Sequence, residues 1–202
     1  KVAIIEKEAL GGICLNWGCI PTKSFLRSAE VLKIIEGSEK YGINSKLGDI
    51  DIRKVVKRSR SIAKKLSSGV EYLLKKNKVV IFDGEASFKT SKSIIITSKN
   101  NVVKEITGKN VCIASGGRPR EISGIPNSSN VWFYKEALQV DKIPNKLLIV
   151  GSGAIGVEFA SFFAQMGSEV SVLESKPTIL PNEDLEVSNF VEKQFLNRGI
   201  KI

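Results

Sequence analysis

The stretch Gly11-Gly12-Ile13-Cys14-Leu15-Asn16-Trp17-Gly18-Cys19-Ile20-Pro21-Thr22-Lys23 places two cysteines, with four residues between them, at the start of a helical pattern. A regular helix holds positions five apart too far from each other for a disulfide, whose Cα atoms must lie within about 7 Å. Pairing of Cys14 with Cys19 therefore requires a distorted first turn. Pro21 suits a first helical turn, so Cys19 is expected beside the positive end of the helix, where a thiolate is stabilised. The pattern is typical of a redox pair whose two sulfurs differ in role.

A zinc half-site or a pair of buried thiols is the alternative interpretation of these cysteines. A zinc site needs two further Cys or His ligands, but the chain has no histidine and only one more cysteine. We therefore expect no metal. Three cysteines are too few for a disulfide scaffold, so a catalytic pair is favoured.

Length and composition indicate a globular protein of one or two domains, with 42% hydrophobic residues among 202. No apolar run approaches the ~18 residues of a membrane helix, and no signal peptide is evident, so a cytoplasmic protein without membrane association is expected. The net charge of +10 would suit nucleic acid or an anionic surface. However, the lysines are spread along the chain, which favours solvated side chains and no nucleic-acid partner.

The first residues form a strand pattern, Lys1 to Glu6, that ends in a carboxylate. In a Rossmann unit such a strand is the second one, it follows a GxGxxG loop, and its terminal acid binds the adenosine ribose. Glu6 is the candidate for this acid. Because nothing lies upstream, we expect the first strand and its pyrophosphate loop to be missing.

Two helices are predicted next, at residues 24–35 and from Asp51 to Leu74. Asp51 is a suitable N-cap, and apolar residues recur at steps of three and four along the second helix. Its opposite face is basic and is expected to face solvent, with a phosphate backbone or anionic lipid as the alternative. This face comprises Arg53, Lys54, Lys57, Arg58, Arg60, Lys64 and Lys65.

Short runs rich in β-formers follow, separated by turn residues. They cover 79–82, 86–88, 94–97, 102–106 and 111–114. We expect a small β-meander that leads into a final strand at 111–114. Cys112 lies within this last run and is expected to be a buried residue without a redox partner.

The second nucleotide motif is more complete than the first. Residues 146–150 form a strand pattern, Gly151-Ser152-Gly153-Ala154-Ile155-Gly156 fulfils GxGxxG at a helix start, and a strand at 169–173 ends in Glu174. The helix amides would hold a pyrophosphate. Glu174 would accept from a ribose 2′-OH and repel a 2′-phosphate, which favours NAD over NADP. A βαβ unit that binds no nucleotide is the alternative.

The predicted fold class is therefore α/β, with two Rossmann-like dinucleotide-binding domains, both incomplete, and a small β-meander; the family resemblance given below implies that they are FAD- and NAD(P)-binding domains. Residues 1–120 form the first domain and carry the cysteine pair, and residues 121–202 form the second. The Gly-, Pro- and Ser-rich segment 121–130 is expected to connect them. One more helix is predicted at 184–196, after which the chain ends as it enters a strand.

The cysteine stretch resembles the active-site segment of the pyridine nucleotide-disulfide oxidoreductase family. The sequence Cys-Leu-Asn-Trp-Gly-Cys-Ile-Pro-Thr-Lys most resembles the dihydrolipoamide dehydrogenase branch, which serves 2-oxo acid dehydrogenase complexes. The resemblance implies a Cys14–Cys19 disulfide in which Cys14 exchanges with the substrate dithiol and Cys19 contacts the flavin. The sequence departs from the family at Ile13, where threonine is usual, and isoleucine has no hydroxyl for the contact near the flavin that the resemblance implies.

The resemblance also implies the remaining site residues. Lys23 would pair with Glu158 beside the flavin N5, so the catalytic set is Cys14, Cys19, Lys23 and Glu158. The residues expected to bind the two cofactors, FAD and NAD, are Glu6, Lys7, Gly11, Gly12, Lys23, Gly84, Ser115, Gly116, Gly117, Gly151, Ser152, Gly153, Ala154, Ile155, Gly156, Glu158 and Glu174.

By this resemblance, electrons pass from a dihydrolipoyl group through the disulfide and FAD to NAD, in a homodimeric parent enzyme. The family's C-terminal domain supplies an acid/base histidine, and the chain has no histidine, so we expect the chain alone to be inactive. A glutathione or mercuric reductase is a poorer match, because the active-site sequence of those enzymes usually has Val at the positions of Leu15 and Trp17. A non-catalytic nucleotide-binding fragment is the other alternative.

Overall fold

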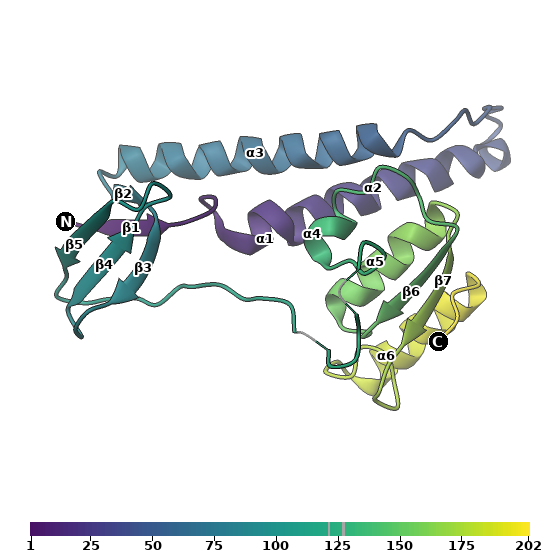
Figure 1. The fold of residues 1–202 in the computed structure, drawn as a ribbon. Coiled ribbons are helices and arrows are strands. Elements are labelled where there is room, and N and C mark those ends of the chain that lie inside the picture. Colours follow the sequence, from purple (N-terminus) through teal and green to yellow (C-terminus); the bar gives the residue numbers. More distant parts are fainter. Residues whose placement is uncertain (121, 127) are drawn as a thin grey trace.

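The computed structural model describes residues 1–120, 122–126 and 128–202. Figure 1 shows one long helix along one side of the molecule, a three-stranded sheet at one end and a βαβ unit at the other. The order of elements is β1 (Ala3–Glu6), α1 (Gly12–Trp17), α2 (Cys19–Glu36), the 3₁₀ helix η1 (Ser38–Tyr41), α3 (Ile52–Lys76), β2 (Val80–Asp83), β3 (Glu85–Phe88), β4 (Ser93–Thr97), β5 (Val103–Thr107), α4 (Tyr134–Ala137), β6 (Lys146–Val150), α5 (Ala154–Gln165), β7 (Glu169–Leu173) and α6 (Leu185–Asn197).

Helices α2 and α3 lie side by side, and the chain reverses direction between them (Figure 1). The predicted N-cap of α3 is confirmed, because the Asp51 side chain accepts from the backbone N–H of Lys54. The solvent-facing assignment was wrong for Arg60, which is half-buried against the end of α1. Arg58, although exposed, donates to Ser24 Oγ on α2 at 2.8 Å. Carbonyl and hydroxyl acceptors on the neighbouring segment hold these two side chains, and an amphipathic pattern within one helix does not reveal such acceptors.

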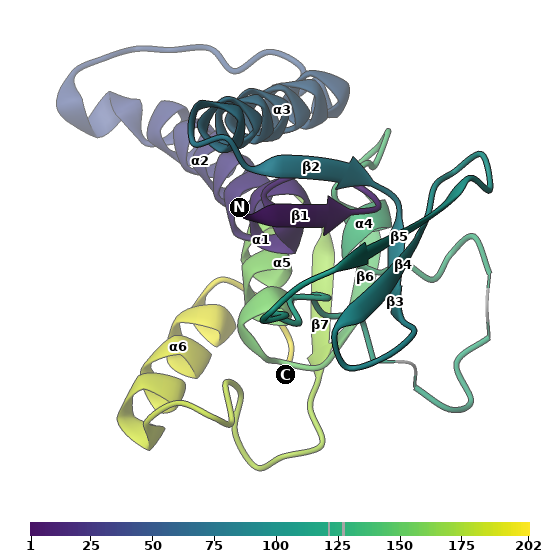
Figure 2. The same cartoon turned by 90° about the vertical axis from the view of Figure 1, so that its left-hand side faces the viewer.

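Strands β3, β4 and β5 form the predicted antiparallel meander. The run at 79–82 was wrongly included in it, because β2 pairs in parallel with β1, from Ala3 opposite Val80 to Glu6 opposite Asp83. Figure 2 shows these two strands side by side above the meander. The local sequence identifies a strand but does not specify its partner, since partner choice depends on contacts far apart in the chain.

The strand predicted at 111–114 is absent, and Cys112, expected to be buried, is exposed. Ile113 is 74% exposed. A strand exists through the ladder hydrogen bonds it makes with a neighbour, and 111–114 pairs with none of the strands in the described part of the chain. The segment Ser115–Gly117 therefore does not stand at the end of a strand.

The predicted βαβ unit is confirmed at the other end of the molecule. Strands β6 and β7 are parallel, with Lys146 opposite Glu169, and α5 connects them. β6 is less buried than its apolar sequence suggested, because α5 covers one face of the two-stranded sheet and Leu148 and Val150 on the other face are exposed. The predicted last helix is α6, and Lys201 then forms an isolated parallel bridge to β7.

The core lies between α2 and α5. Phe25 of α2 and Phe162 of α5 are fully buried, with ring centroids 4.7 Å apart, and Phe162 makes an edge contact with Phe163 at 5.0 Å. The helix that carries Cys19 and the helix that follows the glycine loop are therefore packed directly against each other.

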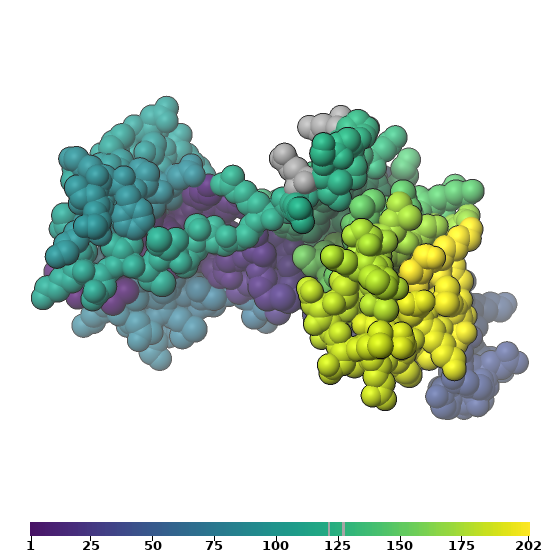
Figure 3. Space-filling model, turned by 90° about the horizontal axis from the view of Figure 1, so that it is seen from below, coloured from purple at the N-terminus to yellow at the C-terminus, as the bar shows by residue number. Residues whose placement is uncertain are grey.

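Residues 108–120 follow the meander and contain no helix or strand. They run from the meander toward the βαβ unit along the face seen in Figure 3. The expected boundary at residue 121 lies outside the described residues, as does residue 127, whereas 122–126 and 128–130 contain no helix or strand. Among the described residues, no helix combines the length and apolarity needed to cross a bilayer, and no three His, Cys, Asp or Glu side chains are grouped to hold a metal.

Candidate active site

The two cysteines of the motif form a disulfide at a break between two helices. Cys14 lies on α1, Cys19 is the first residue of α2, and their Cα atoms are 4.9 Å apart. The helical path is interrupted at Gly18, whose φ of −130° and ψ of −116° are not helical. A Cβ there would lie 3.1 Å from the Cα of Cys14. The expected distortion is confirmed, and it is what brings the two Cα atoms within disulfide range.

The six-residue helix α1 was not predicted. It begins after Gly11, whose φ is +97°, and it depends on Asn16, which is 5% exposed. The Asn16 Nδ2 donates to the carbonyl oxygens of Leu10 at 3.0 Å and Gly12 at 2.9 Å. Asparagine side chains readily bind nearby backbone groups, so an Asn within a glycine-bounded loop was the signal available in the sequence.

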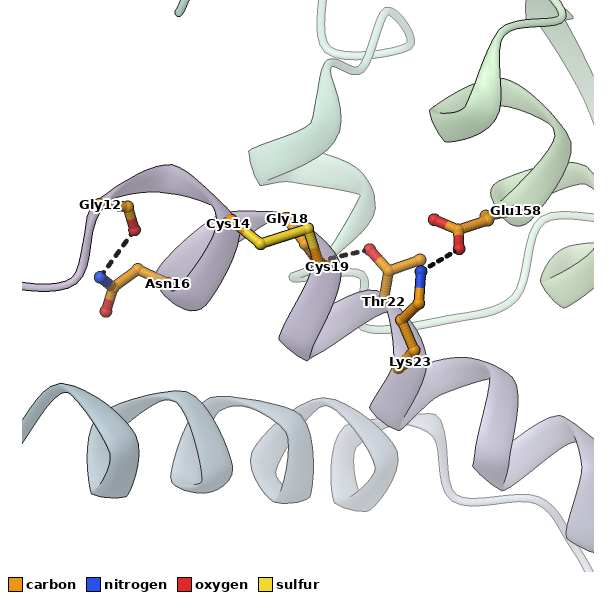
Figure 4. Close-up of a disulfide and its surroundings, with 8 residues drawn as sticks. All are labelled: Gly12, Cys14, Asn16, Gly18, Cys19, Thr22, Lys23 and Glu158. Carbon is orange, nitrogen blue, oxygen red and sulfur yellow. Dashed lines mark hydrogen bonds and ion pairs between the residues drawn. A yellow bond between two sulfur atoms is a disulfide. The ribbon is translucent and has the colours of Figure 1, made fainter. Parts of the chain in front are cut away.

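The two sulfurs lie in different surroundings. Cys19 starts α2, where the unpaired N–H groups favour a thiolate, and the Thr22 hydroxyl donates to the Gly18 carbonyl at 2.8 Å (Figure 4). Cys14 instead lines an open, largely apolar groove of about 650 Å³. The side chains around this groove come from the redox segment and α3: Leu15, Ile20, Leu66, Val70, Tyr72 and Leu73.

Lys23 and Glu158 form an ion pair between α2 and α5. Lys23 Nζ lies 2.5 Å from Glu158 Oε1, as Figure 4 shows beside the disulfide. The Lys23 side chain is 64% exposed and that of Glu158 25%. The structure thus brings together two residues that lie 135 positions apart and that the resemblance had paired.

At each of the three glycine positions of the GxGxxG loop, the structure explains why glycine is present. Gly151 has a φ of +97°, which favours glycine. Gly153 faces open space, where backbone can approach a ligand. At Gly156 a Cβ would lie 2.1 Å from the Gly151 carbonyl oxygen, so helix α5 fits against the loop only without a side chain there. These are the roles of glycine in a dinucleotide-binding turn.

Glu174 lies beside this loop at the end of β7. Its Oε2 accepts from the N–H of Ser152 at 2.9 Å and from its hydroxyl at 2.6 Å, and its Oε1 accepts from the N–H groups of Ser175 and Lys176. These hydrogen bonds, those of Ser152 first, lower the pKa of Glu174 to about 2. The carboxylate is therefore ionised and oriented before any ligand arrives.

Because the pKa of Glu174 is lower in the folded chain than the ordinary 4.5, its ionised form stabilises the fold above about pH 4.5, and this contribution is lost as the pH falls through about 2. Glu174→Gln should therefore lower the free energy of unfolding by a constant amount above about pH 6 and by progressively less below pH 5. Urea unfolding at a series of pH values measures this difference. A difference that is equal at pH 3 and pH 7 would contradict the assignment.

Glu6, Lys7 and Gly84 gather at the carboxyl ends of β1 and β2, the edge at which nucleotides bind in parallel sheets. The Gly84 N–H donates to the Glu6 carbonyl at 3.0 Å, and the Glu6 carboxylate accepts from the N–H of Glu8. A Cβ at Gly84 would lie 2.7 Å from the Thr97 carbonyl oxygen, so this glycine also allows close packing of the strands. Strand packing alone therefore explains why glycine is present at position 84, whether or not Gly84 contacts a nucleotide.

The profile of the pyridine nucleotide-disulphide oxidoreductases matches residues 1–202. The chain belongs to this family. It is 47% identical to the dihydrolipoyl dehydrogenase of Zymomonas mobilis and 44% identical to that of Rhizobium etli, and each match covers the whole chain but only 44% and 45% of the relative. The chain thus spans less than half the length of these curated relatives.

Solved structures of similar fold include LpdA from Mycobacterium tuberculosis, with a TM-score of 0.89 at 24% identity, and the HOCl-induced flavoprotein disulfide reductase RclA from Escherichia coli, with a TM-score of 0.81 at 28% identity. Both matches cover the whole chain, and 44% and 42% of the respective structure. They confirm the Rossmann-like α/β fold of disulfide oxidoreductases that the motifs predicted.

For a member of this family, the described residues fit a flavin in part. The Glu6 carboxylate lies at the end of β1, Gly12 has open space around its backbone, and Lys23 pairs with Glu158, which is compatible with the flavin contacts that the resemblance implies. The segment Ser115–Gly117, by contrast, is exposed and irregular, so no strand end positions it. The sequence missed two further residues at the site, Trp17 and Arg60, because their contacts join segments more than forty residues apart.

Proposed function

We propose that the chain is the part of a flavoprotein disulfide oxidoreductase that passes electrons from a dihydrolipoyl group through Cys14–Cys19 and FAD to NAD. One observation carries the proposal: the disulfide lies at a helix break, and the Lys23–Glu158 pair joins that helix to the helix of the glycine loop. Relatives named dihydrolipoyl dehydrogenase, at up to 47% identity, support the choice of substrate.

The environment of each sulfur supports a definite exchange. A thiolate of the dihydrolipoyl group attacks Cys14 Sγ in the groove, the Cys14–Cys19 bond breaks, and Cys19 leaves as a thiolate at the start of α2. The second substrate thiolate then attacks its own mixed disulfide, Cys14 leaves, and the substrate closes to a cyclic disulfide. Two electrons pass to the protein. The apolar groove suits the hydrocarbon part of the substrate.

A bound flavin would accept the two electrons from the dithiol and deliver them to a nicotinamide. Lys23 and Glu158 hold opposite charges beside the disulfide, and the first-turn amides of α5 are free to donate to a pyrophosphate. The ionised Glu174 favours a ribose with a free 2′-OH over a 2′-phosphate, which supports NAD over NADP. The proposed FAD contacts are Glu6, Lys7, Gly11, Gly12, Gly84, Ser115, Gly116 and Gly117.

The proposal extends to the context of the protein. The relatives' name supports a lipoyl-bearing 2-oxo acid dehydrogenase complex as partner. A homodimeric parent, which the family resemblance of the cysteine stretch implies, and a cytoplasmic location, expected from the sequence pattern, complete the proposal. The separate β1–β2 and β6–β7 sheets support a division into FAD-binding residues 1–120 and NAD-binding residues 121–202.

Reduction of the oxidised chain with dihydrolipoamide tests the proposal. We expect two additional thiols, located by alkylation and mass spectrometry at Cys14 and Cys19, while Cys112 is alkylated before and after reduction. Cys112→Ser should leave the reaction unchanged, and glutathione should reduce the disulfide less completely than the dithiol at equal thiol concentration. A native bond to Cys112, or no reduction by dihydrolipoamide, would contradict the proposal.

A further inference from the structure

Arg60 of α3 contacts the redox segment in two ways. Its Nη1 donates to the carbonyl oxygen of Asn16, and its guanidinium carbon lies 3.7 Å from the centroid of the Trp17 ring. Stacking on an aromatic face and donation to an acceptor at its edge are both properties of the planar guanidinium. One side chain thus holds the last two residues of α1.

The contact falls where α1 needs a partner. The last carbonyl groups of a helix have no N–H partner within the helix. In α1 the helical path ends at Gly18, directly after Trp17. The segment that leads into α1 is also attached to α3, because the Ser67 hydroxyl donates to the Leu10 carbonyl at 2.8 Å. Helix α3 therefore supports both the end of the short helix that carries Cys14 and the segment that leads into it.

Reduction removes the disulfide between α1 and α2. What then keeps the two cysteines close is the backbone through Gly18 and the contacts that hold α1 against α3. We propose that Arg60 is a positioning residue that, through Asn16 and Trp17, keeps Cys14 within bonding distance of Cys19 in the dithiol form. It thereby sets the equilibrium between dithiol and disulfide. The inference rests on the proposed function in one respect, that this pair cycles between the two forms.

Equilibration of the 202-residue chain in glutathione buffers tests the role. In this reaction the protein disulfide and two reduced glutathiones give the protein dithiol and one oxidised glutathione, so electrons and protons balance. In Arg60→Met the two thiols are held together less well, and the equilibrium should shift about fivefold toward the dithiol, as expected for partial loss of a charge-assisted hydrogen bond. Alkylation followed by mass spectrometry measures the dithiol fraction.

Arg58→Met is the matched control. Arg58 lies on the same helix and carries the same charge, but it donates to Ser24 of α2 and not to the segment that carries Cys14. Its removal should change the equilibrium less than twofold. Arg60→Lys keeps the positive charge without the planar group, so it should shift the equilibrium in the same direction as Arg60→Met and by less. If Arg60→Met does not fold, Arg60→Lys is compared with Arg58→Met in its place.

An equilibrium constant in both Arg60 variants equal to that of the unaltered chain, or an equal shift in Arg58→Met, would overturn the positioning role. A disulfide in the unaltered chain that glutathione and dihydrolipoamide both fail to reduce would overturn the proposed function together with this inference. Normal reduction of the unaltered chain with no effect of either Arg60 substitution would overturn the inference alone.

Discussion

Phe162→Ala is expected to lower the free energy of unfolding by about 4 kcal/mol, in the range measured for large-to-small aromatic substitutions in cores. Phe162 is fully buried on α5, and its ring lies 4.7 Å from that of Phe25 and 5.0 Å from that of Phe163. Its removal leaves a cavity between α2 and α5 that neighbouring rings fill only partly. A domain is typically stable by only about 5–15 kcal/mol, so a large part of the stability is lost.

Phe190→Ala is the control for this prediction. Phe190 also lies in a helix, α6, but it is 64% exposed, so the same change of residue should alter the free energy of unfolding by less than about 0.5 kcal/mol. Urea unfolding followed by circular dichroism measures both variants. Equal losses in the two would show that the α2–α5 interface contributes no more than the exposed surface.

Gly156→Ala is expected to destabilise the chain by about 2 kcal/mol. A Cβ at this position would lie 2.1 Å from the Gly151 carbonyl oxygen, a backbone atom that moves only with the loop. Such overpacking costs about 3 kcal/mol at the upper end of the usual range, whereas alanine gains about 1 kcal/mol over glycine within a helix. The steric term is therefore the larger one. The thermal unfolding midpoint and the free energy from urea unfolding both report it.

Gly153→Ala is the matched substitution in the same loop. It has open space around its Cβ position and a φ of −67°, so the fold should tolerate alanine with little change in stability. If this glycine is where the backbone approaches a pyrophosphate, the methyl group should weaken NAD⁺ binding while unfolding stays unchanged. Calorimetry with NAD⁺, and with NADP⁺ as comparison ligand, measures this. Loss of stability in Gly153→Ala equal to that in Gly156→Ala would contradict the separate roles of the two glycines.

The elements that the sequence predicted correctly have strong local signals. The glycine loop, the strand before it and Glu174 lie within about thirty residues and satisfy one spacing rule, so the βαβ unit was recognisable from residues 146–174 alone. Asp51 was recognised as an N-cap for the same reason, because a cap acts on N–H groups two or three positions away.

The errors concern partners that lie far apart in the chain. The run at 111–114 has a strand-like composition but no neighbouring strand, and β2 has the composition of the meander but pairs with β1. Arg60 was assigned to a solvated face because its own helix gave no indication that Asn16 would lie opposite. The flavin contacts expected at Ser115–Gly117 depend on the first of these errors and remain predictions.

The contact between Phe25 and Phe162 has a consequence for motion. Interdigitated rings resist sliding, because a core packed at native density has no free volume into which a ring can move. The helix with Cys19 and the helix after Gly153 should therefore move as one rigid body, even though more than 110 residues separate them in the chain. The distance between the thiol chemistry at Cys19 and the glycine loop is then a fixed dimension of the molecule.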